Sequence, residues 1–175
     1  MINKKYLKSL SPCEDRYKHY LEHYKDWSGS LEEFLDLPEL THDDKKWVFV
    51  RSIDKDKLRL VAADFAERVL HIFESKYPND DRLRKAIEAA RGDDKGAAAY
   101  AADAAYAAAD AYYDSYAAYA SANAAANAAR AAAHAADAAY AAYAANAADD
   151  SCENEEKAQI EIMKRYAREA LKGTE

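Results

Sequence analysis

A stripe of polar and aromatic side chains recurs at steps of three or four residues in the second half of the chain. In order, its members are Tyr116, Tyr119, Asn123, Asn127, Arg130, His134, Asp137 and Tyr140. On one helix this spacing places every member on the same face. Rigid aromatic anchors beside adaptable polar groups are typical of binding surfaces. Two interpretations therefore stay open: a recognition surface, or a solvated stripe on a helix that buries its other faces.

Three members of this stripe have side chains suited to anion binding or acid–base chemistry. A histidine between an arginine and a carboxylate, as in Arg130, His134 and Asp137, can exchange a proton near neutral pH. No nucleophile or phosphate-binding loop accompanies them in the sequence. An ion-pair cluster is therefore the simpler interpretation of the three residues.

A second group of charges opens a predicted helix at residues 81–85, where Arg84 and Lys85 follow an aspartate. Basic side chains beside free amide groups at a helix start can bind a phosphate. Pairing of these cations with carboxylates of the same helix, such as Glu88, is the competing interpretation. We count Arg84, Lys85 and the aromatic Trp47 as candidate partner- or ligand-binding residues.

Other catalytic and metal-binding patterns are weak. Asp15, His19 and His23 recur every four residues, and two such histidines can chelate a divalent metal. No third clustered histidine or cysteine and no H-E-x-x-H motif accompanies them, so we interpret them as surface residues and expect no metal and no cofactor. The chain also lacks phosphate-loop and nucleophile-elbow motifs and has only four glycines. We therefore expect no catalytic residues and no enzymatic activity.

The element that must carry the stripe is an alanine-rich tract at residues 97–149. It contains no Leu, Ile, Val, Met, Phe, Trp, Gly or Pro, and its large side chains are tyrosines. Alanine is the strongest helix former, so the tract is predicted to be helical. One helix of this length would extend roughly 80 Å. A break is therefore expected, first at residues 112–116 and second at residues 121–127.

The remaining segments predict a conventional helical core. Apolar residues at helical spacing mark residues 54–77, and capping-box patterns begin at Ser11, Ser30 and Thr41. Residues 47–50 have strand propensity, but no partner strand is evident, so they are interpreted as buried helix. The prediction is one all-α domain over residues 1–175: N-terminal helices (1–40), core helices (41–96), Ala/Tyr-rich helices (97–149) and a C-terminal amphipathic helix (150–175). The alanine-rich helices should pack as a bundle on the Leu/Phe/Trp core.

Composition narrows the class of partner. The chain has 175 residues and a net charge of -7, which gives no electrostatic reason to bind DNA directly. Two distant cysteines without a C-x-x-C context suggest reduced thiols. No apolar signal region or membrane-spanning run is evident. We therefore expect a location in the bacterial cytoplasm.

Three segments carry a resemblance to a known family. They are Trp47, residues 59–66, and the R-x-R-K-A-I-E stretch at residues 82–88, followed by the alanine tract and the amphipathic residues 156–166. In this order they resemble the alanine-rich "putative immunity protein" family of bacteria and their phages. The R-x-R-K-A-I-E stretch is the most specific part of the likeness.

The resemblance implies an immunity or anti-defence role in conflict between phages and bacteria, by stoichiometric sequestration. In one version the target is a protein toxin or defence effector. In another, the protein is a phage sponge for a nucleotide-derived immune signal, whose phosphates would contact Arg84, Lys85, Arg130 and His134 while a tyrosine or Trp47 stacks on the base. A structural helical assembly without a ligand is a third version. A homo-oligomer that buries alanine faces is compatible with the first two.

Overall fold

The computed structural model describes residues 1–92, 105, 116–130, 141, 144–145, 147 and 152–172. The chain divides into two compact units. The first comprises Met1–Ile53 with Met163–Glu175, and the second comprises Asp54–Ile162. The division falls within the last helix, α10 (Cys152–Lys172). The prediction of one domain over residues 1–175 remains a prediction.

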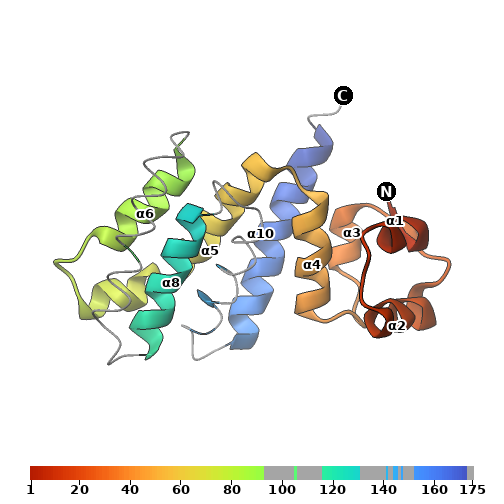
Figure 1. The fold of residues 1–175 in the computed structure, drawn as a ribbon, viewed down its shortest axis with the longest axis horizontal. Helices are drawn as coiled ribbons and strands as arrows, with labels where there is room; N and C mark the ends of the chain where they lie inside the picture. Colours follow the sequence, from red (N-terminus) through yellow and green to blue (C-terminus); the bar gives the residue numbers. More distant parts are fainter. Residues whose placement is uncertain are drawn as a thin grey trace. The chain divides into compact units, whose positions relative to one another are not determined.

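The first unit gathers short helices around a conventional apolar core (Figure 1). Its elements are β1 (Ile2–Asn3), α1 (Lys4–Ser9), α2 (Glu14–Tyr24), β2 (Ser28–Gly29), α3 (Leu31–Leu35) and α4 (His42–Ser52). Seven buried residues form the core: Ile2, Leu7, Tyr20, Phe34, Leu37, Leu40 and Val48. Two ion pairs join the end of α10 to α3 and the residue after it, Lys164 to Asp36 at 2.8 Å and Arg168 to Glu32 at 2.6 Å.

Local capping explains where these helices begin. Ser30 and Thr41 each form a capping box, in which the side chain accepts a hydrogen bond from the third helical amide. Both starts confirm the sequence prediction. The predicted start at Ser11 is wrong, because α2 begins at Glu14 with Cys13 as its N-cap. Ser11 instead has a positive φ of 57° and donates its amide to Lys8, so it terminates the preceding helix α1.

The second unit contains α5 (Lys55–Lys76), α6 (Arg82–Arg91), α8 (Tyr116–Arg130) and the first part of α10. Helix α6 buries Leu83, Ala86, Ile87 and Ala90, which follow the spacing of one helix face. Helix α8 packs along α5 and also contacts α6. The core of this unit therefore combines the large apolar side chains of α5 and α6 with the alanines of α8.

Alanine brings α8 close to the backbone of α5. The Ser121 hydroxyl is buried and donates a 2.7 Å hydrogen bond to the Val69 carbonyl oxygen of α5. A serine side chain reaches a neighbouring helix backbone only when the two axes lie close together, which small residues permit. Ala124, Ala125 and Ala128 share the Ser121 face and are also buried.

The predicted all-α class is confirmed, with a two-stranded pairing of β1 and β2 as the described sheet. Residues 47–50 lie inside α4, so their interpretation as buried helix is confirmed. The alternative break at residues 121–127 is wrong, because α8 continues through them. The preferred break at residues 112–116 lies outside the described residues except for Tyr116, where α8 begins.

Candidate partner-binding surface

The outward face of α8 coincides with part of the predicted stripe. Asn123 and Asn127 are half-buried and Arg130 is exposed, whereas Ser121 and the described alanines of this helix are buried. At 3.6 residues per turn, the three polar positions fall within an arc of roughly 60°. Both earlier interpretations required this outward arc, so a recognition surface and a solvated stripe both stay open.

The rest of the stripe is described less fully. Tyr116 and Tyr119 belong to the first turns of α8. His134, Asp137 and Tyr140 lie outside the described residues. The role of the whole stripe in binding therefore stays a prediction.

The candidate cations of α6 are engaged by carboxylates. The Nη2 atom of Arg84 donates to both carboxylate oxygens of Glu74 of α5, at 2.6 and 2.8 Å. Lys85 pairs with Asp81 one turn earlier, at 2.8 Å, and the hydrogen bond that the ammonium group donates to this carboxylate raises the pKa of Lys85. The predicted intrahelical pairing is thus seen for Lys85, although with Asp81. Arg84 is paired across two helices instead.

A network of charges continues along the α5–α6 surface. Arg91 contacts Asp64 at 2.8 Å and Glu67 at 2.5 Å, and its hydrogen bond lowers the pKa of Glu67. Arg59 donates to the carbonyl oxygens of Ala90 and Gly92 at the end of α6. Arginines of this surface therefore join helices and satisfy helix-terminal carbonyl groups.

Trp47 belongs to the first unit, where it lies half-buried on α4. It lines a cavity of about 40 Å³ with aromatic and charged neighbours that include Tyr17, Tyr20, Arg16 and Asp44. The Arg51 guanidinium carbon lies 4.1 Å from the centroid of the Trp47 ring. A cation–π contact thus already covers one face of the ring that was predicted to stack on a base.

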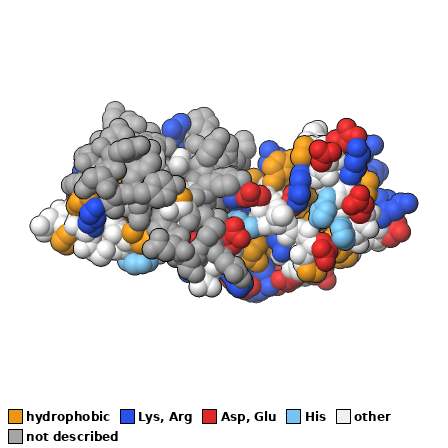
Figure 2. Space-filling view, turned by 90° about the horizontal axis from the view of Figure 1, so that it is seen from below, with side chains coloured by type: hydrophobic (Ala, Val, Ile, Leu, Met, Phe, Trp, Pro, Cys, Tyr) orange, Lys and Arg blue, Asp and Glu red, His pale blue; other side chains and the backbone are white. Residues whose placement is uncertain are grey.

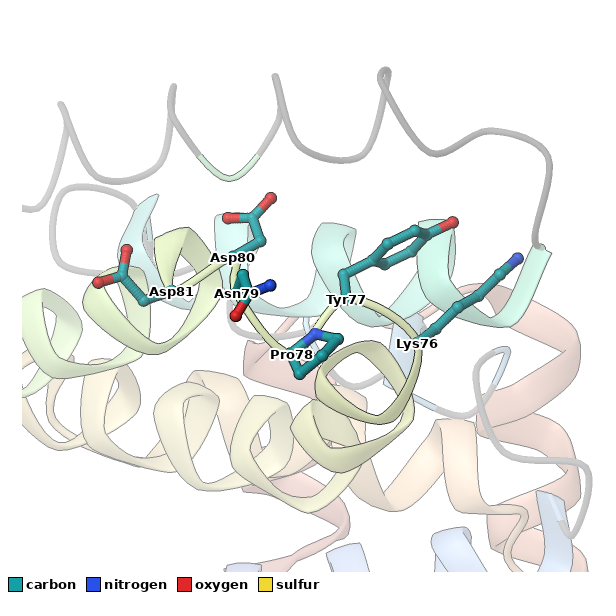
Figure 3. A pocket seen from close by; sticks show the side chains of 6 residues that line it. All are labelled: Lys76, Tyr77, Pro78, Asn79, Asp80 and Asp81. Atoms are coloured by element: carbon teal, nitrogen blue, oxygen red, sulfur yellow. The ribbon is translucent and has the colours of Figure 1, made fainter.

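Sequence reasoning missed a hollow at the connection between α5 and α6. Figure 3 shows its lining, in which Lys76 and Tyr77 extend in the same direction and Asp80 lies across the turn. The hollow has a volume of about 500 Å³. The Nε and Nη2 atoms of Arg82 donate to the two carboxylate oxygens of Asp80, at 2.9 and 2.5 Å. The sequence signal for this hollow was a tyrosine beside a Pro-Asn-Asp turn, because turns commonly carry binding residues.

A buried carboxylate in α10 was also missed. The Glu155 side chain is 1% exposed and accepts hydrogen bonds from Arg68 of α5 at 2.8 Å and from Gln159 at 3.1 Å. Glu155, Gln159 and Met163 follow one another at four-residue steps on the buried face of α10. A carboxylate among the apolar positions of a helix was therefore the sequence signal for this site. The ion pair between Glu155 and Arg68 anchors α10 to α5.

The second unit is therefore an alanine-packed helical scaffold. It carries the polar face of α8 and the charged surface of α5 and α6. Residues 50–166 match the family described as Imm-5 like putative immunity protein. The chain belongs to this family, and the matched segment includes the whole second unit. Membership assigns the chain an immunity-type role, which implies a binding partner such as a toxin and is generally non-enzymatic.

No match to the chain was found among curated proteins or among solved structures. In the described portions of the chain, no helix combines the length and apolar character that crossing a bilayer requires. Figure 2 shows acidic, basic and histidine side chains intermixed over the N-terminal helices of the first unit.

Proposed function

We propose that this protein neutralises a protein toxin or defence effector of phage–bacteria conflict by binding it stoichiometrically, without catalysis. The observation that carries the proposal is the family match across the second unit. Asn123, Asn127 and Arg130 form a polar arc on one face of α8 in that unit. A net charge of -7 favours association with a basic target, since many toxic nucleases are basic.

The contacts of the candidate cations favour a protein over a nucleotide-derived signal. A phosphate ligand at Arg84 or Lys85 would compete with Glu74 or Asp81, each of which already contacts the cation at 2.8 Å or less. A base stacking on the face of Trp47 covered by Arg51 would have to displace that guanidinium. Such displacement weakens binding, because each lost contact offsets part of the new one.

The test is affinity purification of the tagged chain from its bacterial host, followed by native mass spectrometry. We expect a complex of the chain with one protein species at a fixed ratio. An adduct of nucleotide mass without a protein would replace the proposal with the sponge. A chain that carries neither would overturn both versions in favour of a structural assembly.

A matched pair of variants locates the surface. Replacing Asn123, Asn127 and Arg130 together by alanine preserves helix propensity, so the fold should persist. We expect this variant to lose the complex. The control replaces the exposed pair Glu14 and Lys18 of α2 by alanine and should keep it. Equal retention by both variants would show that the α8 arc is not the binding surface.

A further inference from the structure

Helix α2 in the first unit presents a cluster of metal-ligating side chains. His19, Glu22 and His23 each offer one ligand atom, and these atoms all lie within 4.8 Å of one another. Positions separated by three and four residues lie on the same helix face, which explains the clustering. The cluster precedes residue 50, so it lies outside the segment that matches the immunity family.

The structure selects different ligands from those weighed in the sequence. Asp15 was the carboxylate considered there, but Glu22 is the carboxylate that joins the two histidines. The two imidazole rings stand with centroids 4.8 Å apart and planes tilted by 57°. Two histidines and one glutamate form a ligand set that binds zinc in proteins with a fourth position open to water.

A neighbouring carbonyl group orients one ligand. The Nε2 atom of His19 lies 2.7 Å from the backbone oxygen of Glu39 and can donate to it. This hydrogen bond defines the ring tautomer and leaves Nδ1 as the atom with a free lone pair, as in metal sites where a carbonyl group orients a ligating histidine.

The other two ligands are available. Within the parts of the chain that the structure describes, neither the Glu22 carboxylate nor the His23 ring forms a hydrogen bond or ion pair. The nearby Lys18 ammonium is directed to Glu14, at 2.8 Å, in the preceding turn. Ligand atoms around tetrahedral zinc lie about 3.3 Å apart. Glu22 and His23 are exposed and His19 is half-buried. Changes of rotamer can therefore shorten the distances between the ligand atoms, now up to 4.8 Å, to this value.

We propose that His19, Glu22 and His23 form a binding site for a divalent transition metal ion of the Zn²⁺ class. Imidazole and carboxylate ligands suit this class, and affinity should rise from Co²⁺ to Ni²⁺ to Cu²⁺. The ion would join two turns of α2 and hold His19 against Glu39. Its effect would be to stabilise the N-terminal helices, since a ligand that binds only the folded state raises stability.

The test is calorimetric titration of the untagged full chain with Zn²⁺ at neutral pH, in a Cys13→Ser background that removes an exposed thiol. We expect one ion per chain and a rise in melting temperature. His23→Ala and Glu22→Gln should each weaken binding by at least about tenfold. His71→Ala, which removes an exposed histidine of α5, is the matched control and should bind as the parent does.

Cobalt spectroscopy provides a second measurement. Co²⁺ bound to nitrogen and oxygen ligands lacks the strong thiolate charge-transfer bands that a cysteine site would show. Absence of binding, or binding that survives His23→Ala, would overturn the proposal. Thiolate bands would also overturn it, because they would place the ion at a cysteine. None of these outcomes affects the proposed toxin binding, which rests on the second unit.

Discussion

The N-terminal helices and the α5–α8 layer bury apolar surface in two different ways. The first unit places large side chains such as Phe34 and Tyr20 in its core. Helix α8 contributes alanines and a single buried serine. Burial is worth about 0.8 kcal/mol per methylene-sized group, so each alanine contributes much less than a phenylalanine. An alanine-rich helix must therefore gain stability from close approach along its length.

The difference predicts opposite sensitivities to side-chain volume. A core of large side chains is damaged most by their removal, which leaves a cavity. An interface built from alanine is damaged by additions, because the helix axes cannot stay close together.

Phe34→Ala should have the largest effect. The Phe34 side chain is 1% exposed and contacts the Tyr20 and Trp27 rings. We expect a loss of about 3–5 kcal/mol in the free energy of unfolding, measured by urea denaturation. Phe34→Leu, which keeps most of the volume, is the control and should cost clearly less. Equal losses for both variants would contradict a cavity mechanism.

Ala125→Leu should destabilise the α5–α8 interface by about 1–3 kcal/mol. Ala125 lies one turn after Ser121, whose hydroxyl contacts the α5 backbone, and is 1% exposed. Thermal and urea denaturation both measure the change. The same substitution at half-buried Asn123 should have little effect. If the two leucine variants were equally stable, α8 would not be closely packed on that face.

His42, at the start of α4, predicts a pH effect of intermediate size. Burial, and then the nearby Lys46 charge, lower the pKa of His42 to about 4. The unfolded chain has the higher pKa of 6.5 and so binds more protons as the pH falls. Stability should therefore be constant above pH 6.5 and decrease between pH 6.5 and 4, by roughly 1–2 kcal/mol after allowance for screening.

Urea denaturation across this pH range measures the His42 effect. His42→Gln should flatten the dependence between pH 6.5 and 5, where most carboxylates remain ionised. An unchanged slope in His42→Gln would assign the pH dependence to other groups.

The smallest effect should come from the charges on the alanine-packed unit. The side chains of Arg84 and Glu74 are 51% and 31% exposed, so their pairing is screened by water. A double-mutant cycle with Arg84→Ala and Glu74→Ala should give a coupling energy of about 0.2–1 kcal/mol that decreases at high salt. A coupling several times larger would show that this ion pair, in addition to apolar packing, holds α6 on α5.

The distance in sequence between interacting residues explains which predictions from sequence succeeded. Ser30 and Thr41 were identified as helix starts because a capping box involves residues three apart. The start at Ser11 failed because that residue terminates α1, a helix whose short sequence gave little periodic signal. The break at residues 121–127 failed for another reason. The packing of α8 on α5 stabilises a continuous helix through Ser121 and two asparagines, despite their lower helix propensity.

At the candidate surface, too, the sequence predicted the arrangement within one helix but not the contacts between residues far apart in the chain. Spacing alone placed Asn123, Asn127 and Arg130 on one face of a helix, and this face is the outward arc of α8. Spacing did not reveal that Arg84 contacts Glu74 or that Glu155 is buried against Arg68, because these partners are far apart in the sequence.

The helical class, two of the capped starts and the periodicity that assigns side chains to faces could all be predicted from the sequence. These depend on interactions within a few residues, which composition and spacing encode directly. The tertiary structure decided which cations are paired, which carboxylate is buried and which three ligand atoms gather on α2. These outcomes depend on which helices pack together and which rotamers their side chains adopt, and many arrangements of the same helices satisfy the same local pattern.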